Sequence, residues 1–509
     1  MSVKNIPDNT PVLVASGQVV VRNVTSPQQV RSPVQLAADA VMAALETSGC
    51  SALGEAVDTL VMTRMAIDSF SLLEHPFGSS SKPPVSVAAL SDLSPQQAIY
   101  SREGGQSPQR LINEFSASIR AGEHQCVVLC GGEATGAMKQ ALKHGWQLDW
   151  HDEPYGEMLD CGAQEIMNDL ELQHHITFPP QVYALFENAW RHKQGLSVAE
   201  HRQLIGRLFS RFSDIAAANP YAQFPTALTS EFIANASADN FLMNEPYHKW
   251  MVAQDAVNQG AAVIMMSVGK ARELNIPEFQ WVFIHGHGDA DDTFVSQRES
   301  LDASWSMKTA CQQALQMADI SAQQISQFDL YSCFPVAVLA ACDALDIPWD
   351  AQQDLTVTGG LPFFGGAGNN YSMHAIAQMY HNLLASPDEF GLVLANGGYL
   401  TKASVGIYSV RPCTKSLPAT KPCAKECSER EVLFPFEGQA VIESYSLVYK
   451  RDIPTQGLIV GRDKIFGRRV LAKMPDGDQS AAKFLMSDEP IGKEVSVRTH
   501  ASGCEFFAV

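Results

Sequence analysis

Three glycine-rich segments at the ends of predicted strands carry the residues whose types could do chemistry in this chain. The longest, residues 358–374, holds five glycines and passes directly into an amphipathic helix. Glycine lets backbone N–H groups approach a ligand closely, and the N-terminus of a following helix adds partial positive charge. Gly104-Gly105 and Gly397-Gly398 share this local design. We expect one binding site where the three segments meet, and a set of turns built of glycine for steric reasons alone is the alternative.

The residues that we expect at this site are backbone positions and short polar side chains of these three segments. They are Gly105, Ser107, Gly365, Gly366, Asn369, Asn396 and Gly397.

The composition is that of an acidic globular protein. The formal charge is −19, which disfavours nucleic acid and anionic membranes as partners. No apolar run reaches the roughly 18 residues of a membrane-spanning helix. Residues 1–8 also lack the apolar core of a secretory signal. The 11 cysteines follow no disulfide framework, so we expect buried, reduced thiols and a cytoplasmic location.

Two clusters contain metal-ligating residue types, but neither has convincing spacing. Cys423 and Cys427, together with Cys413, lack a second pair or a histidine at zinc spacing. Residues 285–292 are rich in His and Asp and could coordinate a cation, but we interpret them as a polar loop after a strand. We therefore predict no metal site.

Predicted strands and helices alternate along most of the chain, which is typical of a parallel sheet covered by helices. Ser32 with Pro33, and Ser107 with Pro108, each predict an N-cap followed by the first residue of a helix. Residues 135–245 interrupt the alternation with helical, aromatic-rich sequence, as a lid or substrate domain would. The pattern predicts a first half, an inserted helical loop domain and a similar second half, at residues 1–134 with 246–270, 135–245 and 271–410.

The charge distribution changes near residue 410. Residues 411–509 carry a net charge of +2, whereas the rest of the chain carries −21. Three prolines mark residues 411–431 as a charged linker. Short β-branched runs then predict a small, OB-like antiparallel barrel at residues 432–509, with negligible helix and with loops that could bind a ligand.

Taken in order, several short motifs resemble the thiolase superfamily over roughly residues 8–410. They are Gly104-Gly105-Gln106-Ser107-Pro108-Gln109, Gly131-Gly132-Glu133-Ala134, Asn244-Glu-Pro-Tyr-His-Lys249, Tyr331-Ser-Cys-Phe334 and residues 359–374. Within the superfamily, the chain is most similar to the sterol-carrier-protein-type thiolases and the thiolase-like acetyl-CoA acetyltransferases. The resemblance implies an α/β thiolase fold of two similar βαβ halves, to which the C-terminal barrel is an addition.

The resemblance also implies a pocket for CoA or acyl-CoA, bound as a ligand and not covalently. Arg207 and Arg211, one turn apart on a predicted helix of the inserted domain, could bind the nucleotide phosphates. A solvated helix face is the alternative for these two arginines.

The same comparison implies that the catalytic side chains of active thiolases are replaced here. The nucleophilic cysteine, which a helix N-terminus keeps as a thiolate, falls on Gly105. The histidine of the Gly-His-Pro motif falls within residues 365–367, and the acid–base cysteine of the Cys-x-Gly motif falls on Ala395. Tyr331 begins the remaining motif, at the position where active relatives hold a water or the thioester oxygen.

Three functions remain open. The first is an acyltransferase relative in lipid metabolism that binds acyl-CoA and performs weak or altered acyl chemistry. The second is a retro-aldol lyase on a CoA thioester, in which Tyr331 and Tyr371 donate and accept protons. The third is a non-catalytic acyl-CoA-binding or docking protein. Thiolases usually dimerise through the first half-sheet, and both a monomer and a homodimer fit this sequence.

Overall fold

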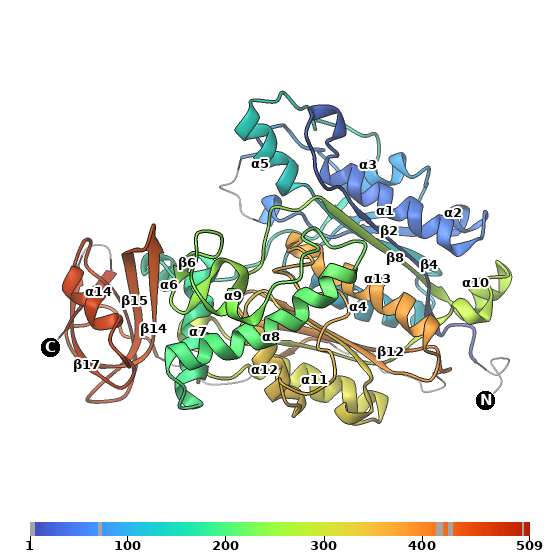
Figure 1. Ribbon diagram of the computed structural model, residues 1–509. Helices are drawn as coiled ribbons and strands as arrows, with labels where there is room; N and C mark the ends of the chain where they lie inside the picture. Colours follow the sequence, from blue (N-terminus) through green and yellow to red (C-terminus); the bar gives the residue numbers. More distant parts are fainter. Residues whose placement is uncertain (1–5, 70–73, 414–420, 426–430, 501–502, 509) are drawn as a thin grey trace.

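The structure, a computed structural model, describes residues 6–69, 74–413, 421–425, 431–500 and 503–508. Parts of the predicted linker, Cys427 among them, lie outside the described residues. The chain folds into an α/β core of two half-sheets, an inserted helical segment and a C-terminal barrel (Figure 1).

The two half-sheets join at β1 and β9. The first has the order β1 (Pro11–Val20), β8 (Gln259–Ser267), β4 (Cys126–Glu133), β2 (Thr59–Met62) and β3 (Gln97–Tyr100). The second has the order β9 (Val282–Asp291), β12 (Lys402–Ser409), β11 (Gly391–Gly397) and β10 (Gln327–Leu330). The joint consists of two residue pairs, Val12 with Phe283 and Leu13 with Val282. Each half also contains antiparallel pairs, so the predicted parallel sheet is in fact mixed.

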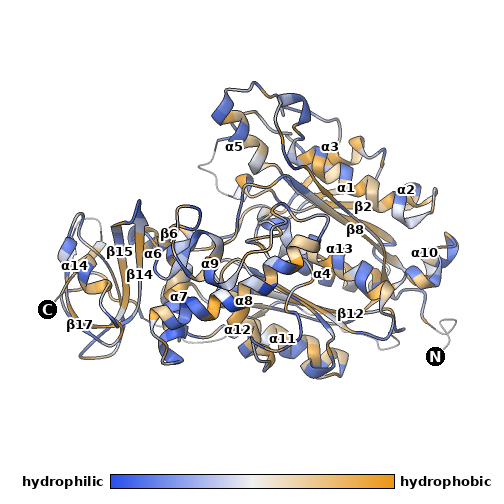
Figure 2. Cartoon of the chain, in the orientation of Figure 1, coloured by the Kyte–Doolittle hydropathy of each residue, from blue (hydrophilic) through white to orange (hydrophobic). Residues whose placement is uncertain are grey.

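Helices cover both faces of each half-sheet, and the core therefore has five layers. α4 (Ser107–Ala121) and α13 (Tyr371–Ala385) contact each other and strands of both half-sheets, so they form the middle layer. The outer layers contain α1 (Pro33–Ser48) and α3 (Pro83–Leu90) on the first half, and α11 (Trp305–Ala318) and α12 (Pro335–Leu345) on the second (Figure 1). Surface helices such as α11 carry hydrophilic and hydrophobic residues on different faces (Figure 2).

Several predicted helix boundaries are confirmed because local capping signals fix them. Ser32 accepts a hydrogen bond from the backbone N–H of Gln35, whose side chain in turn accepts one from the Ser32 N–H, so α1 starts at Pro33. α12 begins at Pro335, and α13 buries the apolar face that includes Met373 and Tyr380.

Four local predictions are wrong. Residues 247–260, for which the sequence predicts a helix, instead contain β7 (Tyr247–His248), a short 3-10 helix and the start of β8. Residues 285–291 belong to β9 and are not a loop. In α4, Gln106 occupies the N-cap position without a side-chain capping hydrogen bond, and Ser107 is the first residue of the helix. The described part of the C-terminal region contains one helix, α14 (Gln479–Leu485), where the sequence predicted negligible helix.

The inserted segment packs against the C-terminal barrel. It comprises α5 (Thr135–His144), β5 (Leu159–Asp160), α6 (Asp169–Gln173), α7 (Pro179–Lys193), α8 (Val198–Ala218), α9 (Ser230–Ala234) and β6 (Leu242–Asn244). The barrel closes because β14 (Gly438–Lys450) pairs with both β15 (Ile453–Asp463) and β17 (Glu494–His500), with β16 (Arg469–Lys473) and β18 (Gly503–Ala508) between them. α7 packs on β14, and β6 extends the barrel sheet through Asn244 and Val448.

Smaller elements complete the described chain: α2 (Leu53–Ala56), α10 (Val268–Glu273), β13 (Cys423–Ala424) and the 3-10 helix η8 (Gly368–Asn370). Among the described helices, none is both long enough and apolar enough to cross a membrane.

Candidate functional site

A cavity of about 440 Å³ lies where the glycine-rich segments meet the inserted helices. Gly104 and Gly105 after β3, Gly366 before η8, and Gly397 and Gly398 at the end of β11 all line it. The inserted segment contributes the start of α7, and the loop between β10 and α12 contributes further wall. These additional residues include Phe178, Pro179, Pro180, Tyr183, Tyr331, Cys333 and Phe334. The volume falls in the usual range for small-molecule sites.

The structure brings most of the predicted binding residues to this cavity. Gly105, Gly366, Asn369, Asn396 and Gly397 line it. The Asn369 side chain donates to the Arg64 carbonyl at 2.9 Å and to Ser69 Oγ at 2.8 Å.

Two predicted binding residues lie outside the cavity wall. Gly365 faces the side chains of Gln259 and Val257. A Cβ at position 365 would clash with both of them. Ser107 lines a separate polar cavity, and its hydroxyl donates to the carbonyls of Arg102 and Glu103 at 3.0 and 3.1 Å. Ser107 is thus occupied with the local backbone.

Tyr331 occupies the space that a side chain at position 105 would need. A Cβ on Gly105 would lie 2.2 Å from the Tyr331 hydroxyl oxygen and 2.5 Å from the Asn396 carbonyl oxygen. Burial raises the pKa of Tyr331, so its hydroxyl stays protonated and can donate a hydrogen bond. Gly105 stands where thiolases have the nucleophilic cysteine, and Tyr331 stands where they have the side chain that holds a water. These two residues are therefore in direct contact.

Tyr371 points away from the cavity. Its hydroxyl lies 2.6 Å from Thr358 Oγ1 and donates to Asp329 Oδ1 at 3.1 Å. Burial and the nearby Asp329 carboxylate raise its pKa well above the ordinary value. This side chain fixes the start of the glycine-rich segment 358–374 and has no contact with the cavity through its hydroxyl.

Arg207 and Arg211 also lie elsewhere. The Arg207 guanidinium stacks over Trp349 at 5.6 Å. Arg211 donates to the backbone carbonyls of Ala351 and Gln353 at 2.6 and 2.8 Å. No Lys or Arg is found among the described residues that line the cavity, so the phosphates of a bound nucleotide would lie outside it.

A polar cluster of Asn396, Tyr183 and Cys333 forms part of the same wall, and Tyr183 is the member that the sequence did not indicate. Asn396 donates to the Tyr183 hydroxyl at 2.9 Å and lies 3.8 Å from the Cys333 sulfur. The Tyr183 ring stacks on Phe334 with 4.2 Å between centroids. Burial raises the pKa of the Cys333 thiol to about 12, so the thiolate needed for nucleophilic attack is scarce at neutral pH.

Glu103 is a second residue that the sequence analysis missed. It lines the cavity, it is only 4% exposed, and its Oε1 atom accepts from the backbone N–H of Gln164. Its Oε2 atom is buried with no hydrogen-bond partner in the described structure. The position of Glu103 directly before Gly104-Gly105 was the one feature of the sequence that could have placed it at the cavity. Tyr183 offered none, because its contact with Asn396 spans more than 200 residues.

Three helices begin at or beside the cavity, and the N-termini of α4 and α13 suit a polarised carbonyl oxygen, whereas the first N–H of α12, that of Val336, donates to Glu187 Oε2 at 2.8 Å. α4 begins two residues after Gly105, α12 begins after Phe334, and α13 begins after η8. The unpaired N–H groups of helix N-termini carry partial positive charge. Ser372 also donates to the Gly105 carbonyl at 3.0 Å and fixes that peptide group.

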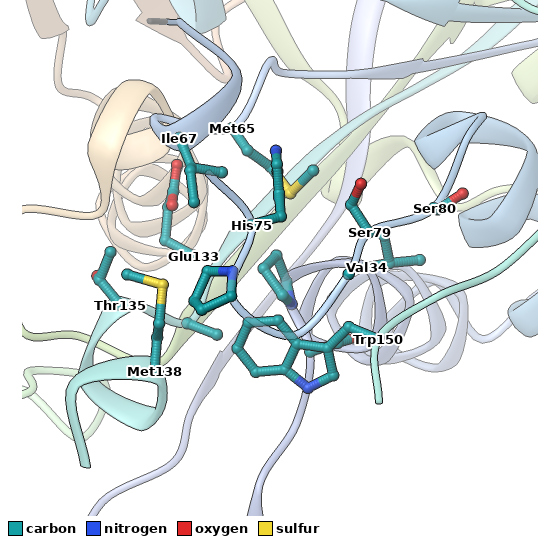
Figure 3. A pocket seen from close by; sticks show the side chains of 15 residues that line it. Val34, Met65, Ile67, His75, Ser79, Ser80, Glu133, Thr135, Met138 and Trp150 are labelled. Atoms are coloured by element: carbon teal, nitrogen blue, oxygen red, sulfur yellow. The ribbon is translucent and has the colours of Figure 1, made fainter. Parts of the chain in front are cut away.

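A smaller pocket of about 40 Å³ lies on the outer side of the first half (Figure 3). Its wall is largely apolar and includes Met65, Met138 and Trp150, with Glu133 and His75 as titratable groups. The Glu133 carboxylate accepts from the backbone N–H of Ala66 at 2.7 Å, and burial raises its pKa to about 8. Ala66 also lines the large cavity, so Glu133 supports part of its wall from behind.

Comparison with known proteins identifies relatives of this chain. Residues 425–501 match a sequence family described as the additional C-terminal domain of thiolase-like protein type 1. A monomeric SCP2-thiolase-like protein type 1 from Mycobacterium smegmatis superposes over 99% of this chain and 100% of its own, with a TM-score of 0.82 and 34% sequence identity.

Other proteins are less similar to this chain and match a smaller part of it. The Ltp2-ChsH2(DUF35) aldolase has a TM-score of 0.57 and 19% identity, over 81% of this chain and 99% of its own. The Acat5 thiolase from Ascaris suum in complex with coenzyme A has a TM-score of 0.57 and 15% identity, over 79% and 99%. An acetyl-CoA acetyltransferase of Methanocaldococcus jannaschii is 25% identical over 227 residues, which are 40% of this chain and about half, 54%, of that protein.

Proposed function

This chain belongs to the SCP2-thiolase-like proteins of type 1, and we propose that its large cavity binds CoA and short acyl-CoA thioesters without forming a covalent acyl-enzyme. The thioester lies beside Gly105, and the helix N-termini of α4 and α13 stabilise its carbonyl oxygen. The related thiolase crystallised with coenzyme A supports this choice of ligand by its fold.

One observation carries the second part of the proposal. The Tyr331 hydroxyl fills the place of any side chain at position 105, since a Cβ there would lie 2.2 Å from it. Attack by a thiolate from this position would require both a different residue at 105 and the removal of Tyr331. Cys333, the cysteine that lines the cavity, has a pKa raised to about 12 and is not activated.

A retro-aldol lyase acting on a CoA thioester is the second candidate function. Such a reaction needs a base that takes the proton of the substrate hydroxyl and a hydrogen-bond donor for the enolate oxygen, but no nucleophilic cysteine. Tyr331, a protonated hydroxyl at the cavity wall, is suited to this role. The aldolase relative supports the candidate by its fold alone. The non-catalytic binder remains the outcome expected if no thioester turns over.

We also propose a reducing compartment, the cytoplasm, and the free thiols of the described cysteines support this choice.

Calorimetric titration with CoA and with butyryl-CoA tests the proposed ligand. Ala253 lines the cavity, and Ala253→Trp should fill part of it and weaken binding at least about tenfold. Ala43→Trp, on α1 and away from the cavity, is the control for the added bulk. Failure of the unmodified protein to bind either ligand at millimolar concentration would overturn the proposal.

A further inference from the structure

Neighbouring residues of the segment between β3 and α4 line two different cavities. Residues 103–105 belong to the wall of the large cavity, whereas Arg102 and Gln106 belong to the wall of a second cavity of about 410 Å³. We call this second space the α4 cavity, because the first turns of α4 form part of it. Its wall also includes Arg110, Leu111, Glu114, Cys161, Asp291 and Pro422. The proposed function makes no use of this space.

One pair of charges in the α4 cavity is already neutralised. The Arg110 guanidinium donates to both carboxylate oxygens of Asp291, at 2.7 and 3.4 Å. Asp289 lies 3.7 Å from the same guanidinium. A two-pronged contact of this kind satisfies both partners, so the charges that remain for a ligand belong to other residues.

A positive end of the cavity has no acidic partner. The Arg102 Nε atom donates to the Cys161 carbonyl at 3.3 Å, which orients the guanidinium, and its two terminal nitrogens have no partner among the described residues. Lys402 lies opposite Asp291 across β12 and β9 and forms no ion pair in the described part of the chain. Burial lowers the pKa of Lys402, and Arg102 is among the nearby charges that lower it further. The two cations therefore lie near each other beside the cavity.

Glu114 supplies the opposite charge. Its carboxylate lines the same cavity and makes no hydrogen bond or ion pair with the residues that the structure describes. Burial raises the pKa of Glu114, and Arg110 and Arg102 lower it in part. Arg102 is therefore near enough to act on Glu114 without pairing with it directly.

Unpaired charges of both signs on one cavity suit a ligand that carries both signs. A carboxylate accepts two parallel hydrogen bonds from an arginine, and an ammonium group donates to a carboxylate. A simple anion would leave Glu114 unpaired, and a simple cation would leave Arg102 unpaired. Leu111 and Pro422 add apolar surface to the wall, which a hydrocarbon side chain can cover.

We infer that the α4 cavity binds an α-amino acid with an apolar side chain. The ligand's carboxylate accepts from Arg102, its ammonium group donates to Glu114, and its side chain packs on Leu111 and Pro422. This site is separate from the one proposed for acyl-CoA and does not depend on it. Because Arg102 and Gln106 flank residues 103–105, an amino acid bound here contacts the segment that contains Gly105.

The test compares amino acids with analogues that lack one of the two charges. Calorimetry and ligand-observed NMR measure binding of L-leucine, L-methionine and L-phenylalanine to the full chain. At least one should bind with a dissociation constant of about 1 mM or lower, a modest affinity for so small a ligand. For L-leucine, the amide (leucinamide) and the N-acetyl derivative should each bind at least about tenfold more weakly, because each leaves one charged side chain unpaired.

Two substitutions assign the contacts, each read with the analogue that cannot make the contact. Arg102→Gln should weaken leucine at least about tenfold but should not weaken leucinamide, which has no carboxylate. Glu114→Gln should weaken leucine by a similar factor but should not weaken N-acetylleucine, which has no ammonium group. Both side chains are exposed, so the variants should keep the fold. Arg31→Gln and Glu123→Gln, at exposed positions outside the cavity wall, are the matched controls and should bind leucine normally.

Three results would overturn the inference. The first is that none of the three amino acids binds at about ten times the expected dissociation constant. The second is that leucine, leucinamide and N-acetylleucine bind equally well. The third is that Arg102→Gln and Glu114→Gln bind leucine as the unmodified protein does. Each of these results would leave the proposed binding of acyl-CoA in the large cavity standing.

Discussion

Gly105 and Tyr331 form a complementary pair, and replacing one alone should be unfavourable. Gly105→Ala places a Cβ within 2.2 Å of the Tyr331 hydroxyl and 2.5 Å of the Asn396 carbonyl. Overpacking of this kind typically lowers the free energy of unfolding by about 1–3 kcal/mol. Chemical denaturation should show this loss.

A double-mutant cycle distinguishes the contact from a general intolerance of side chains. In a Tyr331→Ala background, the cost of Gly105→Ala should fall but remain above zero, because the Asn396 carbonyl is still close. Gly366→Ala in the same cavity should cost less, since the nearest atom to its Cβ would be the Gln254 carbonyl oxygen at 3.3 Å. An equal cost of Gly105→Ala in both backgrounds would contradict the proposed contact.

Tyr331→Phe separates a catalyst from a binder. The substitution removes one hydroxyl and keeps the ring, which packs edge-on against Tyr371. If the protein turns over a thioester, loss of one oxyanion donor should cost about 2.7–4 kcal/mol, or roughly a hundred- to a thousandfold in rate. CoA affinity, measured by calorimetry, should hardly change. An unchanged rate in a protein with measurable turnover would remove Tyr331 from the mechanism.

At this scale, the sequence predicted backbone positions better than side chains. The glycines at 105, 366 and 397 could be placed because glycine density and strand ends are local signals. Tyr371 was placed wrongly, since no local signal shows that its hydroxyl faces Asp329. Arg207 and Arg211 could not be assigned for the same reason: their partners lie 140 or more residues away.

Secondary-structure elements gain their positions from buried polar contacts as well as from apolar packing. Arg469 of β16 is fully buried and bridges the barrel to the core: it donates to Glu443 of β14 at 2.8 Å and to the Arg298 carbonyl at 2.5 Å. This contact holds the barrel against the second half of the core, and the packing of α7 on β14 holds it against the inserted segment. Removal of one partner of a buried pair leaves the other charge uncompensated.

The end of β4 makes stability depend on pH through Glu133. Burial raises its pKa to about 8 from the ordinary value of 4.5, with Asp68 adding to the shift. Between these values the folded protein holds one proton more than the unfolded chain, so the free energy of unfolding falls as the pH rises, by up to about 1.4 kcal/mol per pH unit. Glu133→Gln imitates the protonated form and should lose less stability between pH 5 and pH 8.

Thermal unfolding at several pH values measures the stability of the unmodified protein and of Glu133→Gln. His75 and Asp68 lie near the same carboxylate and are present in both proteins, so their contributions cancel in the difference. Glu46→Gln, at an exposed position of α1, is the control. If stability depended on pH in the same way in the unmodified protein and in Glu133→Gln, folding would not raise the pKa of Glu133, and this prediction would be wrong.

Elements with strong end signals could be predicted, and elements defined by tertiary contacts could not. α1 and α12 follow from Ser or Pro at their starts. β7 was mistaken for helix because its strand pairing depends on β6 and the barrel. β9 continues through its His- and Asp-rich end because β12 pairs with it there.

The whole molecule is expected to be a monomer. Thiolases usually dimerise through the first half-sheet, whose edge strand here is β3. In this chain β5 of the inserted segment pairs with β3 through Ile99 and Tyr100, so part of that edge is already occupied. The Mycobacterium smegmatis relative is described as monomeric. Light scattering coupled to size-exclusion chromatography should give the mass of one chain at micromolar concentration, and a stable dimer would contradict this account.

The overall architecture was the most predictable level, because the order of short motifs carries it even where each motif is weak. Both thiolase halves, the helical insertion and the C-terminal barrel were predicted. The docking of the barrel onto α7 was not, since it depends on surfaces formed only after folding.

A crystal structure of the protein with butyryl-CoA tests the central claim most directly. The account predicts an intact thioester in the large cavity, with its carbonyl beside Gly105 and the nucleotide phosphates outside the wall, and no bond to the protein. Butyryl-CoA bound elsewhere, or a butyryl group attached to Cys333, would contradict it.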